Sequence, residues 1–222
     1  PTIDEVTSDA ADGLTNPYKV GSTVDLKVSF DEVVNVVTGA GTPTLQLDTD
    51  DAPGSVNSEA SYNSGTGTKF PLFRLTVALN NYSEDLNYRA TTSLVLNNGT
   101  IRDAAGNDAT LTLPDPADGS ALAQKKTFWI DGVVPVIQTV GAVTTIGDTI
   151  VTGYWNAKNT GLTVVVPLVS TDISLRGGTI QLQAQAVDAA VTGNWTNLEA
   201  ATTILTARVA AGSQTITASK SG

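Results

Sequence analysis

Short runs of alternating apolar and polar residues, each followed by a turn-rich stretch, constrain the fold of this 222-residue chain more than any other feature. The clearest run is Thr23–Phe30, where an apolar residue stands at every second position from Val24 onward. Such alternation places successive side chains on opposite faces of a β-strand. No window of the chain shows a helical stripe with caps. The sequence therefore predicts an all-β protein built from short antiparallel strands.

The same alternation predicts strands in both halves of the chain. In the first half they lie at 23–30, 44–47, 70–79, 93–96, 109–113 and 127–130. In the second half they lie at 136–140, 149–155, 162–167, 179–187, 194–198, 202–207 and 214–219. Many short strands separated by turns are typical of immunoglobulin or fibronectin type III sandwiches. We therefore predict two tandem immunoglobulin-like (Greek-key) β-sandwiches.

A boundary between two domains is indicated at the run Asp131-Gly-Val-Val-Pro135. Asp-Gly is a turn signal, and proline forces the residue before it toward an extended conformation. Charge changes at the same place: residues 1–133 hold 18 acidic and 8 basic residues, and residues 134–222 hold 4 of each. We expect an acidic domain at 1–133 and a neutral one at 134–222. The short linker lacks a Gly/Ser run, which favours a semi-rigid rod.

Composition excludes several kinds of function. The chain has no Cys and no His, which removes the usual catalytic nucleophile–base pairs and disulfide bonds. The net charge is −10, so the chain lacks the excess of basic residues that nucleic-acid binding needs. No apolar run approaches the ~20 residues that span a bilayer, so no membrane insertion is expected in this fragment. Paired carboxylates for glycoside hydrolysis stay formally open, but we predict that the chain is not an enzyme.

Acidic residues of the first half are concentrated in predicted loops, which suggests a hard cation. Carboxylate and carbonyl oxygens suit calcium, which takes six to eight such ligands. In a seven-strand sandwich, alternate loops reach opposite ends. The end that faces the second domain would gather Asp9, Asp12, Glu84, Asp85 and Asp131. The opposite end would gather Asp103, Asn107 and Asp108, where Gly106 permits a tight turn. The simpler alternatives are solvation of the charges and, at 103–108, an Asx-turn without metal.

Three stretches of the first half are distinctive: VGSTVDLKVSFDE at 20–32, GTPTLQL at 41–47 with YNSGTG at 62–67, and LVLNNGTIRDAAGNDA at 94–109. They resemble bacterial immunoglobulin-like, cadherin-like repeats of very large surface proteins. The second half is similar to a sandwich found beside such repeats, through GYWN at 153–156 and GTIQLQ at 178–183.

The resemblance implies calcium-binding repeats of adhesins and of cell-wall or S-layer-associated proteins, in an extracellular location. Such repeats often bind calcium near the closing motif and at domain joints, which here corresponds to Asp103, Asn107, Asp108 and Asp131. The second half departs from the pattern because it is nearly neutral. Neighbouring repeats of the same polypeptide would then be the main partners.

Three functions remain in view. The first is a calcium-stiffened spacer or assembly unit of a bacterial surface protein. The second is a glycan- or protein-binding module that uses an exposed aromatic patch at Tyr154, Trp155 and Trp195, although tryptophans also serve as core residues. The third is an accessory domain of a secreted hydrolase. Lys27 or Lys125 could also form an isopeptide crosslink, although a lone strand lysine is more commonly a solvated charge.

Overall fold

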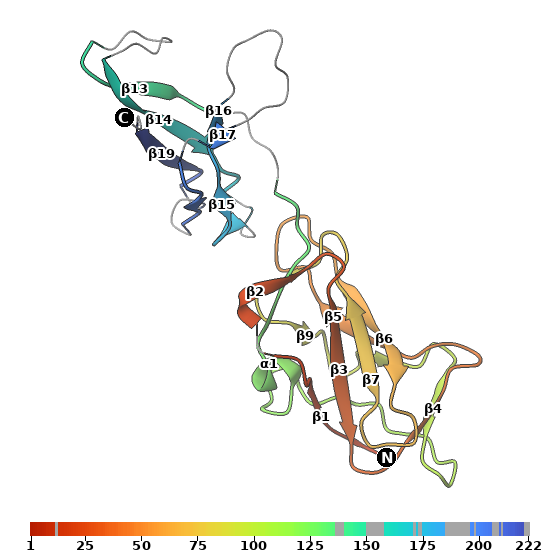
Figure 1. Cartoon of the computed structure of the whole chain (residues 1–222). Coiled ribbons are helices and arrows are strands. Elements are labelled where there is room, and N and C mark those ends of the chain that lie inside the picture. The colour runs from red at the N-terminus through yellow and green to blue at the C-terminus, as the bar shows by residue number, and fades with distance from the viewer. Residues whose placement is uncertain are drawn as a thin grey trace. The chain divides into compact units, whose positions relative to one another are not determined.

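The computed structural model describes residues 1–11, 13–135, 140–149, 158–170, 172, 175–184, 196–197, 199–205, 209 and 211–219. It is nearly all β, with antiparallel sheets, one of which curls into a half-barrel. The chain divides into two compact units, Pro1–Val134 (unit 1) and Pro135–Gly222 (unit 2). Figure 1 shows the strands of both units. Each unit is considered by itself below.

Unit 1 holds strands β1 to β12 and a single helical turn. Their bounds are β1 (Ile3–Thr7), β2 (Gly13–Lys19), β3 (Thr23–Phe30), β4 (Asn35–Val37), β5 (Thr44–Asp48), β6 (Ser58–Ser64), β7 (Leu72–Thr76), β8 (Tyr82–Ser83), β9 (Asn87–Tyr88), β10 (Leu94–Val95), β11 (Thr100–Arg102), α1 (Leu122–Lys125) and β12 (Phe128–Asp131).

The main sheet of unit 1 has the strand order β1-β3-β7-β6-β5-β10, and β9 also pairs with β5. Its strand β3 has the predicted bounds, and the apolar residues of its alternation are buried, which confirms that prediction. The core joins side chains of β3, β5 and β7 to residues of β12 and α1, such as Phe128 and Leu122. Alternation therefore buries one face of the main sheet, as period-two patterning requires.

Two smaller sheets complete unit 1. One has the order β2-β12-β8, and the other pairs β11 with β4. In the first, β12 runs antiparallel to β8, with Asp131 opposite Tyr82, and parallel to β2, with Ile130 opposite Tyr18. The stretch 109–113, predicted as a strand, is not one: it is an extended segment outside the strands. Its ends are held by bonds from the Ala109 amide to the Ile101 carbonyl and from the Leu113 amide to the Thr91 carbonyl.

The strands of unit 1 run between two ends. Ile3 lies opposite Phe30 at the end where β3 finishes. The other end, here called the exit end, comprises residues 20–22, 48–51, 78–82 and 131–132. Backbone hydrogen bonds join several of these segments, from the Tyr82 amide to the Thr49 carbonyl (2.8 Å) and from the Asn80 amide to the Gly132 carbonyl (3.0 Å). The last strand of unit 1 therefore finishes at the exit end, away from the start of β1 (Figure 1).

Unit 2 is also built from antiparallel strands. Their bounds are β13 (Val143–Gly147), β14 (Asn159–Pro167), β15 (Thr179–Ile180), β16 (Gln183–Ala184), β17 (Thr196–Asn197), β18 (Thr202–Thr203) and β19 (Ser213–Ser219). β14 lies between β13 and β19, while β15 pairs with β18 and β16 with β17. The predicted strands at 162–167 and 214–219 are confirmed within β14 and β19. Those at 136–140 and 149–155 lie almost entirely outside the described residues.

Candidate functional site

Three carboxylates meet at the exit end of unit 1, where β5 finishes. One oxygen of each of Asp48, Asp50 and Asp51 lies within 4.8 Å of the others, with Asp48 half-buried and the other two exposed. Within the described part of the chain, no other group of three acidic side chains comes so close. Oxygen ligands at this spacing can share one hard divalent cation such as calcium.

A buried residue between these carboxylates fixes the loop that carries them. Thr49 is fully buried, and its hydroxyl donates a hydrogen bond to the Val56 carbonyl at 2.8 Å. The Thr49 amide donates to the Asn57 side-chain oxygen at 3.1 Å. The Asn57 side-chain amide in turn donates to Asp50 Oδ2 at 2.8 Å. The chain therefore turns inward at Thr49 and leaves a carboxylate on each side of it.

The same loop is bonded to the strand that follows the 78–81 turn. The Tyr82 amide donates to the Thr49 carbonyl at 2.8 Å, and the Asp51 amide donates to the Tyr82 carbonyl at 3.2 Å. The Ser83 hydroxyl donates to Asp51 Oδ2 at 2.8 Å. Tyr82 also lies opposite Asp131 in the pairing of β8 with β12. The acidic loop is thus connected through one short strand to the last strand of unit 1.

The asparagine before Tyr82 holds this arrangement from within. Asn81 is buried, and its side-chain amide donates to the Val56 carbonyl at 3.0 Å. Its side-chain oxygen accepts from the Ala78 amide at 2.8 Å. Because a buried amide that loses its partners is costly, Asn81 fixes the 78–82 turn against the loop that carries the acids.

Crowding of like charges changes the ionisation of one member of the cluster. The pKa of Asp48 is raised above its ordinary value of 3.8, first by burial and then by its hydrogen bond with Asp50 and the nearby charge of Asp51. Arg89 opposes the rise only in part. In the absence of a cation, the cluster is therefore electrostatically unfavourable when fully charged.

This raised pKa predicts an unusual dependence of stability on pH in the presence of a chelator. A carboxyl whose pKa is higher in the folded state penalises folding above that pKa, and the penalty disappears as the pH falls toward the ordinary value of 3.8. Asp48 should therefore contribute a gain in the stability of unit 1 as the pH falls from neutral into this window, opposed at its acid end by Asp25, Asp31 and Asp103, whose pKa values are lowered. Urea unfolding of the full chain at a series of pH values measures the effect, with hydrogen exchange of β5 amides as the reporter of unit 1.

Asp48→Asn is the variant that tests the assignment. It removes the titrating group, so the gain on acidification should disappear while the chain stays folded. Asp4→Asn changes the same charge at an exposed position of β1 and should keep the gain. Identical pH profiles for wild type and Asp48→Asn would contradict the assignment to this cluster.

The residues predicted at the exit-facing end have other partners. Asp9 Oδ1 lies 2.6 Å from Lys27 Nζ. Asp85 Oδ1 accepts a hydrogen bond from the Phe128 amide at 3.3 Å, and Asp131 Oδ1 accepts one from the Val133 amide at 3.2 Å. Glu84 is exposed next to Asp85, and Asp12 lies outside the described residues. These residues stay predicted ligands, and the described ones among them form no group of three close acidic side chains.

The 103–108 motif forms a compact turn. Asp103 accepts hydrogen bonds from the Asn107 amide (2.8 Å) and from the Asn107 side-chain nitrogen (2.7 Å). The Asn107 side chain, followed by its backbone amide, lowers the pKa of Asp103. Gly106 has a φ of 92°, as the tight turn requires. Asp108 pairs with Arg102 at 2.6 Å. The Asp103 carboxylate is thus bonded within its own turn, to a residue four positions further along the chain.

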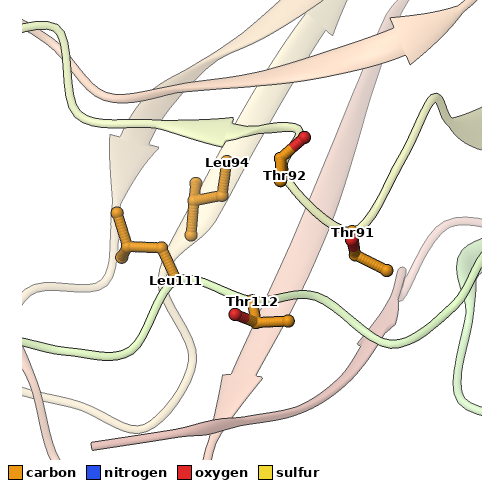
Figure 2. Close-up of a pocket in the computed structure, with 5 residues that line it drawn as sticks. All are labelled: Thr91, Thr92, Leu94, Leu111 and Thr112. Carbon is orange, nitrogen blue, oxygen red and sulfur yellow. The ribbon is translucent and has the colours of Figure 1, made fainter.

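Two pockets of unit 1 are lined by residues that the structure describes. One pocket of about 190 Å³ lies between the 91–94 segment and the 111–112 segment. Figure 2 shows that threonine and leucine side chains line it. A second, polar groove of about 310 Å³ on the main sheet includes Arg74. Arg74 is already bound to Asp25 through two hydrogen bonds, of 2.7 and 2.6 Å.

Two other hypotheses from the sequence concerned an aromatic patch and an isopeptide crosslink. Tyr154, Trp155 and Trp195, the proposed aromatic patch, lie outside the described residues. The lysines considered for an isopeptide crosslink both form ion pairs, Lys27 with the exposed Asp9 and Lys125 with Glu5 at 3.0 Å. Both lysines are thus paired with carboxylates, Lys27 from β3 and Lys125 from the end of α1.

Comparison with known proteins adds no relative: no family model, no curated protein and no solved structure matches the chain. Among the described residues, no helix has the length and apolarity to cross a membrane. The candidate site therefore rests on geometry. Sequence reasoning had placed Asp48, Asp50 and Asp51 in a loop without making them ligands, although three acids in the four-residue run Asp-Thr-Asp-Asp were a usable signal.

Proposed function

We propose that the chain is a non-catalytic structural module of an extracellular protein, a spacer whose first unit is stiffened by calcium. The observation that carries this proposal is the convergence of Asp48, Asp50 and Asp51 within 4.8 Å at the exit end. The absence of Cys and His from the sequence supports a structural role. We further propose that both units are immunoglobulin-like sandwiches in a surface protein of bacterial adhesin type, in accord with the resemblance of the first half.

Calcium suits this site better than a softer metal does. The available ligands are carboxylate oxygens, which the Asn57 side-chain nitrogen and the Ser83 hydroxyl orient by donating hydrogen bonds to Asp50 and Asp51. Hard cations prefer such oxygens, and calcium tolerates irregular geometry completed by water. Imidazole and thiolate, which favour transition metals, do not occur in the sequence. The pKa of Asp48 is raised first by burial and then by the nearby Asp50 and Asp51, and a bound divalent ion would offset both effects by favouring the charged carboxylate.

Binding at this position would stiffen more than one loop. The acidic loop is bonded to Tyr82, and Tyr82 pairs with Asp131 in the last strand of unit 1. An ion held by the loop therefore restrains β5, β8 and β12 together. Because the ion binds the convergent oxygens of the folded state only, it stabilises unit 1 by linkage.

The expected effect is a calcium-dependent gain in the stability of unit 1. With calcium at a hundred to a thousand times its dissociation constant, the free energy of unfolding should rise by ~3–4 kcal/mol. Urea unfolding of the full chain in excess calcium and in chelator, with hydrogen exchange of β3 and β5 amides as the reporter of unit 1, measures this difference.

Asp50→Asn should abolish most of the gain, because it removes a charged ligand while keeping the amide shape. Asp4→Asn, the charge-matched control in β1, should keep it. If wild type and Asp50→Asn respond to calcium equally, the ion is bound elsewhere. If wild type does not respond at all in millimolar calcium, the stiffened-spacer function is wrong.

A further inference from the structure

The pairing of β2 with β12 is parallel, whereas the other strand pairs of the described chain are antiparallel. β2 belongs to the first stretch of unit 1 and β12 is its last strand. Two strands near opposite termini of the unit therefore lie side by side and point the same way. This topology decides how tension along the chain would act on unit 1.

Tension applied through the chain would pull these two strands lengthwise past each other. β1 begins at the end where Ile3 faces Phe30, and the chain leaves β12 at the exit end. Pulling the two chain ends apart first loads β1, which pairs with β3. Once β1 is released, the pull draws β2 back toward the start of β1 and β12 toward the exit end. The hydrogen bonds of a parallel pair cross between the strands. In this pair the register shifts between Phe128 and Ile130, and Ile130 and Asp131 lie opposite Tyr18 and Lys19 without a further shift. The bonds of this last stretch are strained together, whereas a hairpin pulled at its open end loses its bonds one after another.

Side chains resist the same movement. Phe128 and Ile130 of β12 are both fully buried in the core. Tyr18 of β2 packs edge-on against Phe128, with ring centroids 5.8 Å apart and planes at 77°. Moving β12 along β2 must break this ring contact and withdraw both apolar side chains from the core. Backbone hydrogen bonds and side-chain packing therefore both oppose the sliding of β12 along β2.

We propose that the β2–β12 pair is a shear lock that sets the resistance of unit 1 to unfolding under tension. This inference rests on the proposed spacer function, since a spacer in a surface protein transmits force between its ends. Forced unfolding is governed by the unfolding rate. Interactions broken at the barrier control that rate, and interactions still intact there do not. The Tyr18–Phe128 contact belongs to the first kind.

The chain offers a matched control for this contact. Tyr62 packs edge-on against the buried Phe73 with nearly the same geometry, at 5.9 Å and 75°. Its strands, β6 and β7, are antiparallel neighbours inside the main sheet and lie away from the strands at the ends of unit 1. Tyr62→Ala and Tyr18→Ala therefore remove similar contacts, of which only the second lies in the proposed lock.

Single-molecule force spectroscopy of the full chain, held at its two termini, tests the proposal. The longer extension step identifies unit 1, because it contains more residues than unit 2. At fixed force, Tyr18→Ala should raise the unfolding rate of unit 1 about tenfold, as expected for loss of a buried aromatic contact at the barrier. Tyr62→Ala should leave that rate nearly unchanged, although urea unfolding shows a comparable loss of equilibrium stability.

Equal rate increases in the two variants would overturn the shear lock, and so would an unchanged rate in Tyr18→Ala. If Tyr18→Ala does not fold, Tyr18→Leu takes its place. Its unfolding rate at fixed force should again exceed that of the Tyr62 variant. Repeating the series in calcium and in chelator separates the two proposals. A Tyr18 effect without a calcium effect contradicts the calcium-stiffened spacer alone, and a calcium effect without a Tyr18 effect contradicts the shear lock alone.

Discussion

Gly41→Ala should destabilise unit 1 by about 3 kcal/mol, the upper part of the usual range of about 1–3 kcal/mol for a side chain forced into a packed site. A Cβ at Gly41 would lie 1.6 Å from the carbonyl oxygen of Asn97, which cannot move without displacing the 96–99 turn. Gly99 meets Gly41 from the other side, where its own Cβ would lie 2.7 Å from the Gly41 carbonyl oxygen. Two chain segments cross here at a separation that only glycine allows.

Urea unfolding of the full chain, with hydrogen exchange of β5 amides, measures the loss. Gly39→Ala is the control in the same loop, because a Cβ there meets nothing within 4 Å. Gly39→Ala should be neutral or slightly stabilising, because alanine lowers the conformational entropy of the unfolded chain. Equal stability of Gly41→Ala and wild type would show that the two segments do not cross this closely.

Phe128→Ala should be the second large loss, of about 3–5 kcal/mol, as is usual when a buried phenylalanine is truncated. The ring is fully buried, contacts Tyr18 and belongs to the strand that closes unit 1. Its removal leaves a cavity where the main sheet, β12 and α1 meet. Because the stability is lost in unit 1, the hydrogen exchange of β3 and β5 amides should accelerate more than that of β14 and β19 amides.

Leu79→Ala is the control for Phe128→Ala at an exposed position of unit 1. Leu79 is 55% exposed in the 78–81 turn, so its truncation should change stability by no more than about 0.5 kcal/mol. A Phe128→Ala variant as stable as Leu79→Ala would mean that β12 is not part of the core.

Strands with strict alternation were predictable from sequence, and strands held by their neighbours were not. β3 was found because apolar residues occupy every second position and all of them are buried. β6 was not predicted because its sequence, Ser58–Ser64, is polar apart from Ala60 and Tyr62. It lies between β5 and β7 and receives its hydrogen bonds from both. β-propensity is set largely by such surroundings.

A second strand, β2, was missed for a different reason. Gly13–Lys19 contains Gly13, Asn16 and Pro17, which signal a turn or an edge. The strand forms at the edge of its sheet and pairs only with β12, with a shift in register between Phe128 and Ile130. No local pattern predicts pairing between residues that lie more than a hundred positions apart, as here. The feature on which the shear lock depends was therefore visible only in three dimensions.

The sequence predicted acidic side chains gathered at the exit end, but not the three residues that form the close group there. Acidic loops and a hard cation were inferred from composition, and the exit end was expected to hold one cluster. Sequence topology assigned that cluster to Asp9, Asp12, Glu84, Asp85 and Asp131. In the structure, the close group comes from the loop after β5, at Asp48, Asp50 and Asp51. Lys27 pairs with Asp9, a contact that spacing along the chain does not predict.

Crystals of the full chain grown in excess calcium, with the anomalous signal of the ion mapped, test the central claim most directly. The account predicts a peak held by carboxylate oxygens of Asp48, Asp50 and Asp51, at the usual calcium–oxygen distances of about 2.3–2.6 Å. An empty loop after β5 under saturating calcium would contradict the claim, as would a peak confined to the 103–108 turn.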